Sequence, residues 1–158
     1  MPGPAPVLLA AIGNELMGDD ALGPLLIRRI ASFYEIPAEL ELADAGTASH
    51  QLMDLMAGRR AAVLVDALQL DSQPAGTVLR FGRDHLLAEE RRRFSPHQPA
   101  LRETILAAEA LGGRMEQVVL LGVAAESLEM GVGLSESVRA AMPRLEEAVL
   151  TELRALGV

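Results

Sequence analysis

Short apolar runs alternate along this chain with segments whose apolar residues recur at helical spacing. Three of the runs are apolar almost throughout, which is typical of strands buried on both faces of a parallel sheet. Strands that alternate with helices favour an α/β fold. We therefore predict a three-layer sandwich in which helices cover both faces of a mostly parallel sheet of about five strands. The expected strands are 6–12, 40–45, 61–67, 77–81 and 117–123, of which 77–81 could return antiparallel.

The segments between the strands predict helices, each bounded by residues that cap or stop a helix. Pro143 lies inside the last of them and is expected to kink it or to begin a new first turn. From 82 to 99 the pattern is poor, and no element is predicted there. The predicted helices are one from Leu22 to before Pro37, one over 49–58, one over 99–113, and a final region that Ser135 can cap.

The composition narrows the classes of function. The chain has 158 residues, so we expect one domain over residues 1–158. Its formal net charge is −8, so we expect neither nucleic acid nor an anionic membrane as partner. It has no cysteine, which excludes disulfides, thiolate metal sites and a thiol nucleophile. The apolar stretch near the N-terminus is too short for a signal peptide or a membrane span. We expect a cytoplasmic protein that works as a monomer.

The segment AIGNELMGDDALG, residues 11–23, joins the first predicted strand to the first predicted helix. Gly13 and Gly18 are spaced as in a phosphate-binding loop, but Asp19 and Asp20 stand where that loop needs lysine and serine or threonine. Two carboxylates there would repel phosphate, so we do not predict nucleotide binding. One acid can cap the helix, where negative charge is favoured, and the second then needs another explanation.

Two further acids follow predicted strands in the same way. Asp44 ends the second strand, and Asp66 lies at the end of the third. The carboxyl ends of the strands in an open α/β sheet form one edge, and ligands bind there. Asp20, Asp44 and Asp66 are therefore expected to share this edge.

Among the three histidines, His97 is the candidate ligand. A histidine in a loop is by itself more often solvated than functional, and His50 and His85 are expected at the surface. His97, however, lies in FSPHQP, a rigid turn before a predicted helix. Together with two of the acids, its imidazole would form a site for a divalent cation with open coordination positions.

Taken together and in this order, these motifs resemble those of the hydrogenase maturation endopeptidases, which remove the C-terminal extension of the [NiFe]-hydrogenase large subunit. The likeness covers nearly the whole chain. It rests on IGNELMGDDALG after the first strand, DAGTAS after the second, VLVDAL at the third, SPHQ before a helix and GVAAESLEMGVGLS after the last strand.

The resemblance implies a metal site formed by Asp20, Asp66 and His97, with Asp44 at the acid of the family's D-G-G-T motif, near that site. It also implies that the metal is nickel carried by the substrate, the large-subunit precursor, although other divalent cations are expected to occupy the site in the purified protein. Because the sequence suggests no covalent nucleophile, we expect a water or carbonyl polarised by the metal, with Asp44 or Asp66 assisting proton transfer. The alternative is that the metal only positions the cleavage site.

The chain departs from the family where glycine is often found, at Ala11, Ala21 and Ala45. Alanine would be strained there if the backbone required a positive φ. The three predicted ligand positions are intact.

Two other functions stay open at this point. One is an α/β metal-dependent hydrolase of small peptides, which would hold its own metal tightly. The other is a non-catalytic chaperone that senses metal loading of a partner and leaves the partner's length unchanged.

Overall fold

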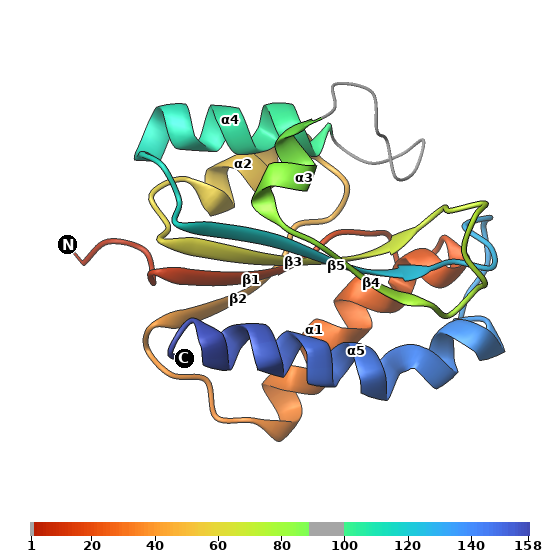
Figure 1. Ribbon diagram of the computed structural model, residues 1–158. Helices are drawn as coiled ribbons and strands as arrows, with labels where there is room; N and C mark the ends of the chain where they lie inside the picture. Colours follow the sequence, from red (N-terminus) through yellow and green to blue (C-terminus); the bar gives the residue numbers. More distant parts are fainter. Residues whose placement is uncertain (1, 89–99) are drawn as a thin grey trace.

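The computed structural model describes residues 2–88 and 100–158. Its strands form one sheet in the order β2-β1-β3-β5-β4, in which β4 alone pairs antiparallel. Helices cover both faces (Figure 1), so the predicted three-layer sandwich and the antiparallel return of the fourth strand are confirmed. The strands are β1 (Val7–Ala11), β2 (Leu40–Asp44), β3 (Ala61–Leu68), β4 (Val78–Phe81) and β5 (Gln117–Ala124), and the helices are η1 (Gly18–Ala21), α1 (Leu22–Phe33), α2 (Ser49–Met56), α3 (Arg83–Ala88), α4 (Leu101–Gly112) and α5 (Glu136–Ala155).

Each face of the sheet packs against its own group of helices (Figure 1). One face buries apolar side chains of α1 and α5, among them Ile30 and Val149. The other face buries apolar side chains of α2, α3 and α4, among them Leu52, Leu86 and Ile105. The sheet is therefore buried on both sides, which explains why its central strands are mostly apolar.

Two features of the helices differ from the prediction. The short helix α3 occupies a segment where no element was predicted, because its six residues bury only Leu86 and so leave no periodic apolar stripe. Helix α5 continues through Pro143, so the alternative of a new helix beginning there is wrong. Ser135 caps α5 as predicted, since its Oγ accepts a hydrogen bond from the N–H of Val138 at 3.4 Å. None of the helices in the described part of the chain is both long and apolar enough to cross a membrane.

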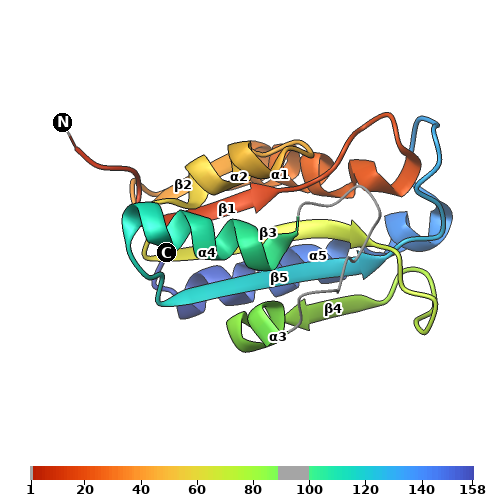
Figure 2. The ribbon, with the colours of Figure 1, turned by 90° about the horizontal axis from the view of Figure 1, so that it is seen from above.

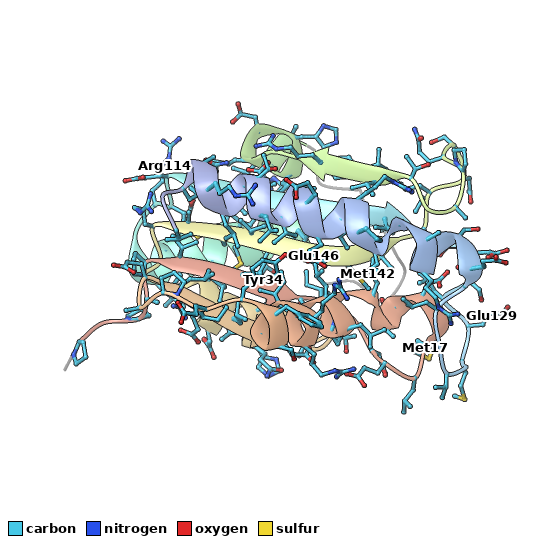
Figure 3. All side chains as sticks on the ribbon, turned by 90° about the horizontal axis from the view of Figure 1, so that it is seen from below. Met17, Tyr34, Arg114, Glu129, Met142 and Glu146 are labelled. Carbon is cyan, nitrogen blue, oxygen red and sulfur yellow. The ribbon has the colours of Figure 1, made fainter. Side chains whose placement is uncertain are left out.

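A carboxylate joins α1 to α5 on one side of the sheet. Glu146 of α5 accepts hydrogen bonds from the guanidinium of Arg29 and, at 2.8 Å, from the hydroxyl of Tyr34, and Figure 3 shows Tyr34 and Glu146 next to each other. Burial raises the pKa of Glu146, but the two hydrogen bonds outweigh it, so that its pKa is lowered overall. This ion pair holds the two helices together as one layer.

The carboxyl ends of β1, β2, β3 and β5 point to one edge of the sheet, and the two chain termini lie at the opposite edge (Figures 1 and 2). In Figure 2 the loops that follow β1 and β5 meet beyond the carboxyl edge. Ligands bind at this edge in open α/β sheets, so a functional site is expected at these loops.

Candidate active site at the carboxyl edge of the sheet

The loop between β1 and α1 folds back onto the end of the sheet because two glycines adopt backbone conformations that other residues rarely take. Gly13 has φ +141°, and a Cβ at this position would lie 2.1 Å from the carbonyl oxygen of Asp20. Gly18 has φ +58°, and its N–H donates to the carbonyl of Gly131 at 2.9 Å. The close approach at Gly13 holds η1, and with it Asp20, next to the end of β1.

Asp20 is half-buried where this loop enters η1. Its carboxylate accepts a hydrogen bond from the N–H of Asn14 at 2.8 Å. Helix η1 contacts β3, and the charge of Asp20 raises the pKa of Asp66 on that strand. The structure therefore brings Asp20 and Asp66 together, although 45 residues of sequence separate them.

Asp66 is fully buried within β3, opposite Gly122 of β5. Both carboxylate oxygens are enclosed and accept no hydrogen bond of normal geometry from the described residues. Burial raises the pKa of Asp66 well above its usual value and the charge of Asp20 raises it further, while the N–H of Ala67 opposes this only in part. A buried carboxylate without a partner is costly, and such groups concentrate at functional sites.

The side chain of Asp66 points to the face covered by α2, α3 and α4. Neighbouring residues of a strand alternate between the two faces of a sheet. Leu64 and Leu68 belong to the core on that face, and Val65 and Ala67 belong to the core against α1 and α5. Asp66 lies between Val65 and Ala67, so its side chain points to the same face as Leu64 and Leu68, which is the face covered by α2, α3 and α4.

Asp44 points to the opposite face. It follows Leu42 by two residues on β2, and Leu42 packs against the core of α1 and α5. The exposed Asp44 closes a turn by accepting a hydrogen bond from the N–H of Gly46 at 3.0 Å. The structure thus places Asp44 at the predicted edge but does not bring its side chain to Asp66, and its role in proton transfer stays a prediction.

A residue of α1 accompanies Asp44 on this face. The pKa of Arg28 is raised first by its hydrogen bond to Glu15 and further by the charge of Asp44. Arg28 therefore lies between the loop after β1 and the loop after β2. The negative charge of Asp44 is in this way partly offset by a nearby guanidinium.

The predicted ligand His97 lies outside the described residues. The elements before and after it, α3 and α4, contribute Leu86 and Leu101 to the core on the face to which Asp66 points. The other histidines, His50 and His85, are exposed as predicted. Among residues 2–88 and 100–158, no three histidine, aspartate or glutamate side chains are arranged to hold a metal ion. Completing a metal site around Asp20 and Asp66 would require a further ligand, for which His97 remains the prediction.

Sequence reasoning missed the role of Asp19. Its carboxylate is buried and accepts four hydrogen bonds from the loop after β5. Neither Asp19 nor Asp20 caps η1 or α1 with its side chain. The predicted capping role is therefore wrong. Asp19 instead fixes η1 to that loop. The donors are the N–H groups of Glu126 (2.9 Å), Ser127 (3.1 Å) and Ser135 (2.7 Å) and the hydroxyl of Ser135 (2.9 Å).

We expect Asp19→Ala to lower the free energy of unfolding by about 2–4 kcal/mol, because four donors around a buried carboxylate lose their acceptor at once. Urea unfolding followed by circular dichroism measures this effect. Glu126→Ala is the matched control, since the exposed Glu126 contributes its backbone N–H to Asp19 and keeps it in the variant. Equal stability of Asp19→Ala and the control would show that the carboxylate does not hold the two loops.

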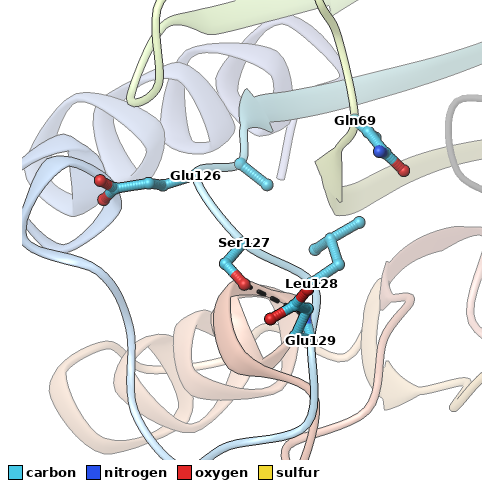
Figure 4. A pocket seen from close by; sticks show the side chains of 6 residues that line it. Gln69, Glu126, Ser127, Leu128 and Glu129 are labelled. Carbon is cyan, nitrogen blue, oxygen red and sulfur yellow. Dashed lines mark hydrogen bonds between the residues drawn. The ribbon is translucent and has the colours of Figure 1, made fainter.

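A hollow opens beside this loop pair at the carboxyl ends of β3 and β5 (Figure 4). Gln69 borders it from the β3 side and Leu128 from the loop after β5. Within that loop the hydroxyl of Ser127 accepts a hydrogen bond from the N–H of Glu129 at 3.2 Å. The remaining lining residues are Ala125 and Glu126. The hollow therefore lies only a few residues along β3 from Asp66.

The three alanines that replace family glycines are unstrained. Ala21 has φ −69°, and within the described residues every positive φ belongs to a glycine. The loops at Ala11, Ala21 and Ala45 therefore keep their conformations without glycine at these positions.

The fold and the site define an α/β protein with a buried acid at the carboxyl edge of its sheet. The family model described as hydrogenase maturation protease matches residues 24–152. The chain belongs to the hydrogenase maturation protease family, and it is accordingly a peptidase.

One curated relative and two solved structures match this chain along almost their whole length. The chain is 32% identical over 152 residues to the hydrogenase 2 maturation protease of Escherichia coli (strain K12). This alignment covers 96% of this chain and 93% of the relative. The structure of the hydrogenase maturating endopeptidase HybD from E. coli superposes with a TM-score of 0.87 at 31% identity, over 96% of this chain and 93% of that one. The [NiFe] hydrogenase maturation protease HybD from Thermococcus kodakarensis gives a TM-score of 0.76 at 25% identity, over 92% and 97%.

Proposed function

We propose that this protein removes the C-terminal extension from the large-subunit precursor of a [NiFe]-hydrogenase once that precursor carries nickel. The observation that carries the proposal is Asp66, a fully buried carboxylate with both oxygens unpaired among the described residues and a second acid, Asp20, beside it. Such a pair is unfavourable by itself and becomes favourable next to a cation.

The donor set supports nickel as the cation. Asp20 and Asp66 supply carboxylate oxygens, and His97 would supply an imidazole nitrogen, which together suit a divalent ion of borderline hardness. Three such ligands leave coordination positions open for the ligands that the substrate itself provides. The nickel is in this proposal part of the substrate, and other divalent ions would bind the purified protein only weakly.

Asp66 is the residue we assign to proton transfer. In the free protein, burial and then the charge of Asp20 raise the pKa of Asp66 well above its usual value, and a positive charge beside the carboxyl group lowers that pKa again. The ionised carboxylate can then accept a proton from a water molecule that attacks the scissile carbonyl. Nickel supplies the positive charge that polarises the water or the carbonyl.

The same arrangement would make cleavage a test of metal insertion. Without a cation, two acids within a partly buried cleft repel each other by an energy on the order of several kcal/mol at an effective dielectric of about 20. A precursor that brings nickel removes this repulsion, and an empty precursor does not. We propose that the protease acts as a monomer on this protein substrate, and the net charge of −8 argues against nucleic acid or an anionic membrane as partner.

Incubation of the protein with the nickel-loaded and the nickel-free precursor, followed by gel electrophoresis and mass spectrometry, tests the proposal. We expect the loaded precursor to be shortened and the nickel-free precursor to keep its length. Equal cleavage of both forms would exclude recognition through nickel, although not peptidase activity. Cleavage of short peptides in the absence of any precursor would instead indicate a hydrolase with its own metal, and binding without shortening would indicate a chaperone.

A further inference from the structure

Three large apolar side chains are exposed on the loops that meet beyond the carboxyl edge. Leu16 lies on the loop after β1 and is 62% exposed, while Met130 and Val132 lie on the loop after β5 and are 85% and 89% exposed. We call these residues the apolar tip. Exposed apolar side chains that gather at one place commonly mark an interaction site.

The backbone brings the three residues next to one another. Met17 and Gly131 form a parallel bridge, in which the N–H of Gly131 donates to the carbonyl of Leu16 at 2.9 Å and the N–H of Gly18 donates to the carbonyl of Gly131 at 2.9 Å. Leu16, Met130 and Val132 all stand one residue away from the bridge.

The tip is held on a fixed backbone. Besides the bridge, the N–H of Asp19 donates to the carbonyl of Ser127 at 3.0 Å, and the Asp19 carboxylate binds the same loop. Figure 3 shows Met17 and Glu129 together at this end of the molecule. A preorganised apolar surface loses less conformational entropy than a flexible loop does when a partner binds. The fixed backbone of the apolar tip therefore suits a binding role.

The loop after β5 carries more acidic than basic side chains, and Arg139 just beyond it donates to the carbonyl of Leu134 at 3.3 Å. Residues 124–138 contain three glutamates and no lysine, arginine or histidine. The three acids, Glu126, Glu129 and Glu136, are exposed. A matching partner surface would therefore combine an apolar recess with basic side chains around it.

We propose that the apolar tip docks this protease onto its folded substrate, the hydrogenase large-subunit precursor, by inserting into an apolar recess bordered by basic residues. The inference rests on the proposed function. Continuity with the site supports this occupant, because Leu16 stands on the same loop as Asp20, four residues before it.

The test is the double variant Met130→Ser/Val132→Ser, assayed for cleavage of the nickel-loaded precursor at a series of precursor concentrations. We expect KM to rise about tenfold or more, because two well-packed apolar contacts are lost, while kcat stays within about twofold. The variant should fold as the parent does, since both side chains are more than 80% exposed. Direct binding of the precursor, measured by biolayer interferometry, should weaken by the same factor.

The double variant Phe33→Ser/Leu111→Ser is the matched control, because it removes two apolar side chains of 70% and 66% exposure that lie away from the carboxyl edge. Its KM should stay within about twofold of the parent. Glu129→Lys should raise KM and weaken the dependence of KM on salt, since it reverses one charge of the acidic border. An unchanged KM in Met130→Ser/Val132→Ser, or an equal rise of KM in the control, would overturn the docking proposal. Failure of the parent protein to cleave the precursor at all would instead overturn the proposed function.

Discussion

Asp66→Asn is expected to abolish cleavage of the nickel-loaded precursor and at the same time to make the protein more stable. The loss of activity should be about hundredfold or more, because asparagine keeps the shape of the side chain but can neither accept a proton nor offer a negative charge to a cation. The gain in stability follows because the Asp66 carboxylate is fully buried in the parent and has no hydrogen-bond partner of normal geometry among residues 2–88 and 100–158. Residues that serve function in this way commonly lower stability.

The pH dependence of this gain has a definite sign. The pKa of Asp66 in the folded protein lies well above the usual aspartate value of 3.8, so the unfolded chain loses this proton at a lower pH than the folded protein does. The parent therefore loses stability as the pH rises above about 4 until the pKa of the folded state is passed, and Asp66→Asn removes this loss. Near neutral pH we expect the variant to be more stable than the parent, and each kcal/mol of that gain corresponds to a rise in Tm of about 2–4 °C for a chain of this size.

Thermal unfolding of both proteins in the presence of a chelator, from pH 4 to pH 8, measures the effect. The difference in Tm should be small at pH 4 and should increase towards neutral pH. A variant that is less stable than the parent near pH 7 would show that Asp66 has a stabilising partner in the free protein.

Asp20→Ala and His97→Ala are also expected to abolish processing, by about hundredfold or more each, because each variant removes one predicted ligand of the substrate's nickel. Asp20→Ala should in addition lower the pKa of Asp66, since one of its two causes of elevation disappears. The measurement is the initial rate of precursor shortening at saturating precursor. Nickel titration of the variants, followed by calorimetry, separates loss of metal contact from loss of substrate docking.

His50→Ala and His85→Ala are the controls for His97, because both histidines are exposed. The ring of His85 lies against that of Phe81 in a tilted arrangement, with 5.0 Å between the ring centroids. Rates within about threefold of the parent are expected for both, as for surface substitutions away from a site. Normal processing by His97→Ala would show that the third ligand is another residue.

Family membership and the positions of the acids could both be read from the chain. The motifs around Asp20, Asp44, Asp66 and His97 indicated hydrogenase maturation endopeptidases, and the comparisons confirm the family. The sequence predicted that Asp20, Asp44 and Asp66 lie at one edge of the sheet, because the carboxyl ends of parallel strands meet there. What could not be read is the difference between Asp44 and Asp66, since the face of a side chain depends on how each strand is placed in the sheet as well as on alternation along the strand.

Asp19 shows the limit of local reasoning most clearly. A carboxylate in the first turn before a helix has a ready local explanation as a cap, and the sequence offered no reason to prefer a partner 116 residues away. Its true partners belong to the loop after β5, which approaches only because the sheet order brings β1 and β5 to either side of β3. The same dependence on distant contacts decides the burial of Asp66 and the position of the apolar tip.

The sequence by itself determined the elements and their order, because long apolar runs and helical periodicity act within a few neighbouring residues. It missed α3, which is too short to show a period, and left open whether Pro143 ends a helix. Only the tertiary structure decided which acid is buried, which is paired and which is exposed. Burial, pKa and hydrogen bonding depend on residues from several strands and loops at once, and no segment of the chain contains that information alone.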